Sequence, residues 1–182
     1  MFIFNLLRIA LGQDSACEPE IAGITLQPGT YYINAGDLQI AANSVLKCNC
    51  TNPTDGVTIV MTSTGGASTI GTATINGGAN VTLQAPTDAG NPFAGLLFYK
   101  DPRATPGATD KFNGGSKMEL TGALYAPTDT VQFSGDNSSA KVVCTQIVAD
   151  QVVFIGNSTI YDTGCPAAGV QPLRITGVKI VE

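Results

Sequence analysis

Two aspartates, Asp129 and Asp150, lie 21 residues apart in a sequence that carries few other charges. Two carboxyl groups about 5 Å apart serve a retaining glycosidase, one as proton donor and one as nucleophile, and they also suit a weak Ca²⁺ site. The spacing makes the two aspartates a candidate carboxylate pair or surface site. The alternative is a pair of exposed turn residues, because Asp129 follows "APT" and Asp150 follows "IVA".

A second group of side chains that could bind a ligand or take part in a reaction lies in the segment "YKDPR". Here Tyr99, Asp101 and Arg103 combine an aromatic ring with an acid and a base, a set that binds sugars or serves a lyase-type site. We treat it as a candidate ligand-facing loop. The alternative is a solvated loop with a local ion pair, which contributes little to stability.

Composition excludes several other kinds of site. The chain has no histidine, which argues against the common zinc, copper and non-haem iron sites and against Ser/His or Cys/His nucleophile pairs. The net charge of −5, without a basic cluster, argues against nucleic acid and anionic membrane as partners. We therefore expect no metal, no cofactor and no catalytic residues.

The five cysteines favour disulfides in an oxidising, extracytoplasmic compartment. Cys144 and Cys165 are also 21 residues apart, and we expect them to form a disulfide. Cys48 and Cys50 are two residues apart on an expected strand and are poorly placed to bridge one another, so we expect Cys17 to pair with one of the two. The alternative is a set of unpaired core cysteines.

The elements that would position these residues follow from a repeat. The segments "KFNG", "QFSG", "VFIG" and "RITG" begin at intervals of 21 residues. Their apolar residues form one series, and their glycines form a second series two positions later. The expected core ladder is Phe112, Phe133, Phe154 and Ile175, and the expected turn ladder is Gly114, Gly135, Gly156 and Gly177.

Such a period without helical periodicity is typical of a β-solenoid, in which equivalent residues stack at about 4.8 Å. We predict an all-β chain that forms a single-stranded, right-handed parallel β-helix of about 21 residues per coil. An antiparallel sandwich with chance spacing is the alternative. An earlier "TING" at Thr74 has the same wording but precedes Lys111 by 37 residues, and the excursions on either side of "AGLLFYK" account for that longer step.

The apolar N-terminus "MFIFNLLRIALG" is too short to span a bilayer and is interrupted by Arg8. We predict a capping helix over residues 1–13, followed by one β-helix domain over residues 14–182. A signal peptide is the alternative, although the segment lacks a charged start and a clear cleavage site.

Several phrases, among them "ATINGGANVTLQAPT", "FAGLLFYKD", "FNGGSKMELTGALYAPT" and "CTQIVADQVVFIGNSTI", resemble the C-terminal region of TadG-like proteins. The resemblance runs in order from about Leu26 to Cys165. It implies a bacterial, envelope-associated component linked to Tad/Flp pilus assembly, and it supplies no catalytic residues. Members of that family often carry a membrane anchor and a von Willebrand A domain upstream, and neither is visible in this sequence.

Together these features predict a non-catalytic, extracytoplasmic structural or adhesive module of a pilus or cell envelope. Its expected partners are proteins of that assembly or surface glycans, without a membrane span in this chain, and self-association is left open. The alternative function is a carbohydrate-binding or polysaccharide-cleaving β-helix protein.

Overall fold

The computed structural model of this chain describes residues 23–113, 118–134 and 144–156, the short segments 2–4 and 7–9, and the single positions 160 and 165. These residues form strands, with one short 3-10 turn at Ala67–Thr69 and no α-helix. The strands are β1 (Phe2–Phe4), β2 (Leu7–Ile9), β3 (Gly23–Leu26), β4 (Gly29–Asn34), β5 (Gly36–Ile40), β6 (Val45–Cys48), β7 (Val57–Thr62), β8 (Ile70–Ile75), β9 (Asn80–Gln84), β10 (Leu96–Lys100), β11 (Thr109–Asn113), β12 (Met118–Ser134) and β13 (Thr145–Ile155).

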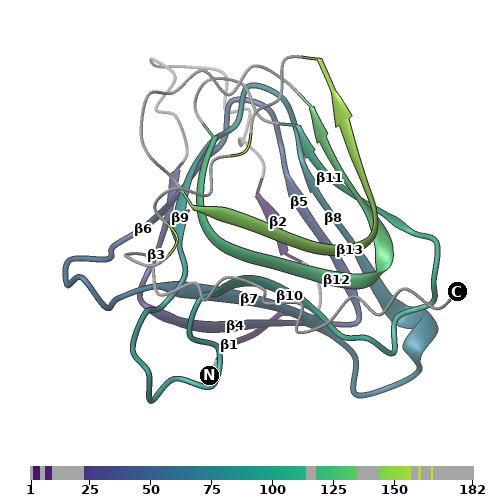
Figure 1. The fold of residues 1–182 in the computed structure, drawn as a ribbon, viewed down its shortest axis with the longest axis horizontal. Helices are drawn as coiled ribbons and strands as arrows, with labels where there is room; N and C mark the ends of the chain where they lie inside the picture. Colours follow the sequence, from purple (N-terminus) through teal and green to yellow (C-terminus); the bar gives the residue numbers. More distant parts are fainter. Residues whose placement is uncertain are drawn as a thin grey trace, which may run out of the picture.

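Every strand pairing in the described part of the chain is parallel. The strands lie in three rows (Figure 1), which are β1-β4-β7-β10, β2-β5-β8-β11 and β3-β6-β9. The long strand β12 crosses all three rows, and β13 lies along β12. Because the chain visits the rows in succession, each pairing among strands β1 to β11 joins a strand to the third strand before or after it. The result is a curled, parallel sheet, consistent with a parallel β-solenoid; we call one passage through the three rows a turn.

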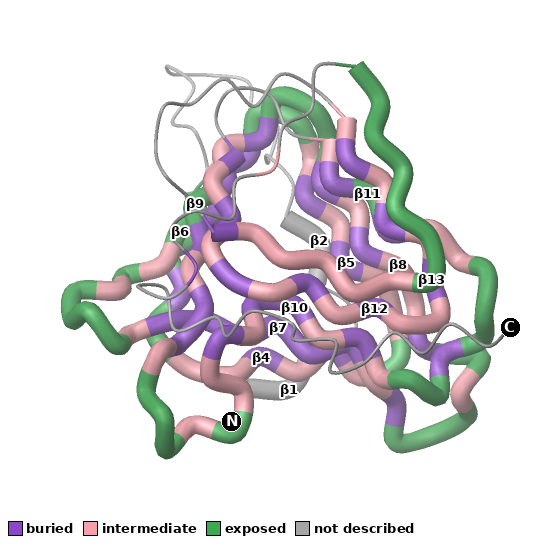
Figure 2. Tube along the Cα trace, in the orientation of Figure 1, coloured by how far each residue is buried: buried purple, intermediate pink, exposed green. Residues whose placement is uncertain are grey.

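Buried residues alternate with less buried ones along strands such as β4, β9 and β12 (Figure 2), and the buried side chains form the interior. In β12 the buried positions alternate from Met118 to Ala126, and the alternation then moves by one residue at Pro127 and Thr128. The register between β12 and β13 shifts at the same place. This corner turns Asp129 toward the interior, on the same side as Val131 and Phe133.

The phenylalanine series lies in one row, as the sequence predicts. Phe112 is in register with Phe133, and Phe133 is in register with Phe154. The rings of Phe112 and Phe133 stack with centroids 5.3 Å apart, and both side chains are buried. Phe154 continues the stack at 6.3 Å but is 51% exposed, so the ladder is interior only in part. Ile175 lies outside the described residues.

The interval of 21 residues holds for these steps and not for the whole chain. In the first row, Tyr31 is in register with Ile59, which is in register with Phe98, steps of 28 and 39 residues. In the second row, Thr74 is in register with Lys111, so "TING" occupies the same row as "KFNG" after a step of 37 residues. The segments before and after β10 lengthen that step, as the sequence indicates, and a uniform coil of 21 residues is therefore wrong for the earlier turns.

Of the four glycines in the expected turn ladder, the structure describes only Gly156. Its φ of 75° lies in the left-handed region that favours glycine, and it follows directly after β13 ends. This geometry fits the expected turn. Gly114, Gly135 and Gly177 lie outside the described residues.

The N-terminal segment differs from the prediction of a helix over residues 1–13. Its described residues form β1 and β2, which pair in parallel with β4 and β5. Strands β4 and β5 supply hydrogen-bond partners for the backbone groups of β1 and β2. An isolated helix of about 13 residues, by contrast, is only marginally stable in water. Strands β1 and β2 therefore extend the first two rows by one strand each.

The stacking of Phe133 yields a test of the interior. Phe133→Ala is expected to lower the free energy of unfolding by about 3–5 kcal/mol, because it removes a ring packed between two neighbouring turns. Urea melts measure the change. The matched variant Phe154→Ala is expected to cost less than half as much, since that ring is half exposed. Equal costs for the two variants would contradict the described ladder.

Candidate functional site

The two aspartates expected to form a carboxylate pair lie in opposite environments. Asp129 is fully buried, whereas Asp150 is exposed on β13. The prediction of a paired or surface site is therefore wrong for Asp129, and so is the alternative of an exposed turn residue there. The physical reason is the corner at Pro127 and Thr128, which rotates Asp129 inward.

Asp129 belongs instead to a buried cluster with Lys100 and Asp110, which we call the buried triad. Lys100 is the last residue of β10, Asp110 the second residue of β11, and Asp129 lies on β12 in the next turn. Lys100 Nζ lies 3.2 Å from Asp110 Oδ1 and 3.4 Å from Asp110 Oδ2, and it contacts Asp129 Oδ2 directly. The side chains are 1% exposed for Lys100 and 0% exposed for both aspartates.

Neighbouring groups hold both carboxyl groups in place. The backbone N–H of Ala73 donates a hydrogen bond of 2.8 Å to Asp110 Oδ1. The Thr128 hydroxyl donates one of 3.2 Å to Asp129 Oδ1. Burial raises the pKa of Asp110 above its ordinary value, and this effect outweighs the opposing influence of Lys100. The triad thus holds one basic and two acidic groups without contact with bulk water.

Sequence reasoning missed Lys100 and Asp110, although a signal for both was present. Asp110 interrupts an apolar series two residues before the phenylalanines, where the later turns have Val131 and Val152. Lys100 lies two residues after the buried Phe98 on the same strand, and alternate residues of a strand share a face. The polar residue in the apolar series and the lysine on the buried face of its strand together indicate an acid and a base that both face the interior.

The candidate loop at Tyr99, Asp101 and Arg103 is described completely, and its two charged side chains contact the protein itself. Arg103 Nη2 lies 2.6 Å from Asp101 Oδ2 and donates a hydrogen bond of 3.0 Å to the Ser63 carbonyl. The Thr62 hydroxyl donates a hydrogen bond of 2.7 Å to Asp101 Oδ2. The loop after β10 is thereby attached to the end of β7 in the preceding turn, which matches the alternative of a local ion pair.

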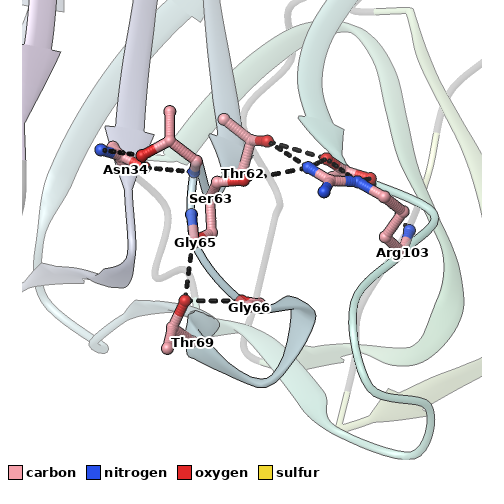
Figure 3. A network of polar contacts seen from close by, with 9 residues as sticks. Asn34, Thr62, Ser63, Gly65, Gly66, Thr69 and Arg103 are labelled. Atoms are coloured by element: carbon pink, nitrogen blue, oxygen red, sulfur yellow. Dashed lines mark hydrogen bonds and ion pairs between the residues drawn. The ribbon is translucent and has the colours of Figure 1, made fainter.

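These bonds continue into a network of polar side chains at the ends of the first-row strands (Figure 3), which we call the corner network. Asn34, at the end of β4, accepts a hydrogen bond of 2.8 Å from the Thr64 backbone N–H. The Ser63 and Thr69 hydroxyls lie 2.7 Å apart, and Thr69 Oγ1 donates to the Gly66 carbonyl. The ends of three successive strands of the first row, β4, β7 and β10, are therefore linked by side-chain hydrogen bonds.

Tyr99 lies on the face of β10 that points away from the interior. Its ring stacks on Tyr125 of the next turn, with centroids 5.3 Å apart and planes 8° from parallel. Partial burial raises the pKa of the Tyr99 hydroxyl, and the nearby Tyr125 and Asp101 add to the effect. The two rings form a half-buried aromatic pair on the outside of the first row.

The link between Asp101 and Arg103 predicts a specific dependence of stability on pH. The side-chain hydrogen bond from Arg103 lowers the pKa of Asp101 from 3.8 to about 2. The unfolded chain therefore takes up this proton first, so the contribution of Asp101 is present above about pH 4 and is lost as the pH falls toward 2. Urea midpoints of wild type and Asp101→Asn, measured across this range, are expected to differ near neutral pH and to converge in acid.

The effects of pH on groups other than Asp101 are common to both proteins and cancel in that difference. Asp150→Asn, at an exposed aspartate, serves as the matched control and is expected to leave the midpoints close to those of wild type. A difference between wild type and Asp101→Asn that stays constant down to pH 2 would contradict the assignment.

The cysteines lie in two pairs. Cys144 and Cys165 form a disulfide with Cα atoms 4.6 Å apart, at the separation of 21 residues expected for neighbouring turns. Cys48 and Cys50 form a second disulfide with Cα atoms 5.2 Å apart. The prediction that these two are poorly placed to bridge is therefore wrong: β6 ends at Cys48, so Cys50 lies beyond the strand and is not held to its alternation. Neither is left to pair with Cys17, which lies outside the described residues.

The two disulfides are expected to differ in their contribution to stability. Replacing Cys144 and Cys165 with alanine should lower the free energy of unfolding by about 3 kcal/mol, since the bond closes a loop of about 20 residues in the unfolded chain. Replacing Cys48 and Cys50 should cost about half as much, because the loop that they close is short. Denaturant melts of both double variants measure this, and peptide mapping of unreduced protein checks the pairing. Equal costs, or free thiols after oxidative expression, would contradict it.

No protein-family model, curated protein or solved structure matches this chain. Within the described segments, no helix has the length and apolar character needed to cross a membrane.

Proposed function

We propose that this chain is a non-catalytic, extracytoplasmic structural or adhesive module of a bacterial Tad/Flp-type pilus or cell envelope. In this proposal it folds as a single-stranded, right-handed parallel β-helix, and it corresponds to the C-terminal region of TadG-like proteins. The role follows from a rigid stack of turns that presents long outer faces to protein partners.

The observation that carries the proposal is the way in which successive turns are joined. Parallel strand pairing links each turn to the next, and the corner network adds side-chain hydrogen bonds between the ends of β4, β7 and β10. The Cys144–Cys165 disulfide supports an oxidising compartment, because such bonds persist mainly outside the cytoplasm. Turns that are joined in this way form a stiff stack, which is the property that a structural module needs.

The exposed side chains of β13 support a protein partner. Among the described strands β13 pairs with β12 and is the last strand of the stack in the sequence. Its side chains from Val152 to Ile155 are apolar and 37–51% exposed. Apolar exposed surface of this kind favours a protein partner over a glycan.

The alternative, a carbohydrate-binding protein, is supported by one observation. Tyr99 and Tyr125 form an outward-facing aromatic pair next to the loop of Arg103, and sugars stack on aromatic faces. The two rings, however, cover one face of each other, which reduces the surface that a sugar ring would contact.

A direct experiment compares the two functions. The oxidised chain is immobilised and tested for binding to purified Tad/Flp pilus-assembly proteins and, in parallel, to a glycan array. We expect protein binding that falls by about tenfold or more in a Val153→Lys, Ile155→Lys double variant, because charges replace exposed apolar side chains of β13. The variant Gln151→Lys adds a charge at an exposed polar position of the same strand and is expected to bind normally.

The glycan array decides the alternative. Binding to glycans that is lost in Tyr125→Ala, without binding to any of the pilus-assembly proteins, would overturn the structural proposal in favour of carbohydrate recognition. A polysaccharide-cleavage screen on the same samples extends the comparison to catalysis.

A further inference from the structure

The buried triad is an unusual component of an otherwise apolar interior. Lys100 is in register with Met61 of the preceding turn, since the pairing of β10 with β7 runs from Phe98 to Lys100. Asp110 is in register with Val131 of the following turn. Met61 and Val131 are fully buried, as are the three members of the triad. The lysine amine and the two carboxyl groups therefore meet inside the stack, away from solvent.

The charges of the triad do not balance. One ammonium faces two carboxylates, and Lys100 is the only cation that the described contacts place at either carboxylate. Burying ions in this way is costly even when they are paired. Transfer of a proton from Lys100 to Asp110 removes two of the three charges, and the raised pKa of Asp110 makes it the natural acceptor. This transfer leaves a neutral amine, which is a nucleophile, in contact with the carboxyl group of Asp129.

We propose that Lys100 and Asp129 react with each other to form an intramolecular isopeptide bond, with Asp110 as the acid–base residue of the reaction. The bond joins Lys100 Nζ to Asp129 Cγ and links β10 covalently to β12 of the next turn. This inference goes beyond the proposed function and does not depend on it.

The reaction balances without any added reagent. Asp110 accepts a proton from the Lys100 ammonium, and the free amine attacks Asp129 Cγ. One C–O bond of Asp129 breaks, and its oxygen leaves as water, with one proton supplied by Asp110 and one by the attacking nitrogen. The ammonium starts with three protons; one remains on the amide and two leave in the water. Asp110 ends as the carboxylate with which it began, as an acid–base catalyst should.

The geometry distinguishes the roles of the two aspartates. Asp110 is fixed by the Ala73 N–H and lies with both oxygens 3.2–3.4 Å from Nζ, a suitable distance for proton transfer. Asp129 contacts Nζ through Oδ2, while its Oδ1 accepts a hydrogen bond from the Thr128 hydroxyl. A donor at that oxygen stabilises the charge that develops when an amine attacks the carbon.

The fold supplies the remaining requirements of the reaction. Strand pairing on both sides holds Lys100 close to Asp129, which replaces a bimolecular encounter with an intramolecular one. Exclusion of bulk water from the triad favours the amide over its hydrolysis. The reaction is therefore expected to follow folding and to be absent from the unfolded chain.

The intact mass of the purified full chain tests the proposal without any variant. After complete reduction of the disulfides and denaturation, the chain is expected to weigh one water molecule less than its sequence. Tryptic digestion locates the loss: trypsin should fail to cleave after Lys100, and the fragment containing this residue should be joined to the fragment 118–141, which contains Asp129.

Variants then assign the roles. Lys100→Met and Asp129→Ala should each restore the full mass, and Asp110→Ala should leave most of the chain unlinked while keeping both reacting residues. Lys111→Arg, at an exposed lysine on β11, is the matched control and should retain the loss of one water. Wild-type protein of full mass that is cleaved after Lys100 would overturn the proposal and leave the triad as an ion cluster. So would a water loss that maps to any other residue pair.

Discussion

The rest of this structure depends on the pairing of each strand with its equivalent in the next turn. Parallel pairing uses the backbone N–H and C=O groups of every turn, so those groups are satisfied only when neighbouring turns keep their register. Fixed register places equivalent side chains directly over one another. Phe112 and Phe133 stack for this reason, and so do Tyr99 and Tyr125 on the outer face.

The same constraint decides what a polar residue can do at each position. An inward position is enclosed by the turns on both sides, so a charged group there must find its partner within reach in the stack. Lys100 and Asp129 lie in neighbouring turns and form such an ion pair. Asp101 and Arg103 lie just beyond the end of β10, where the chain leaves the stack, and their pair is partly open to solvent.

The sequence predicts the parallel stack best where the turns are short. Between Phe112 and Phe154 the chain passes through β12 and β13 with few added residues, so the spacing of 21 reports the register directly. In the earlier turns, loops such as residues 85–95 and 101–108 lengthen the interval and hide the rows. The repeat alone also gives no information on the corner at Pro127 and Thr128, and it therefore does not predict that Asp129 faces the interior.

Local exceptions to a pattern prove more informative about chemistry than the pattern itself. Asp129 and Asp150 share the repeat spacing, yet one is buried against Lys100 and the other faces solvent. Conversely, Asp110 and Lys100 break the apolar alternation of their strands, and those two breaks lie within 3.2 Å of each other in space. In a stacked fold, an acid and a base that interrupt neighbouring inward positions must meet, because the interior leaves no other direction for their side chains. The surrounding stack then sets the reactivity of such an acid or base. Groups of this kind are therefore expected at the irregular positions of the repeat.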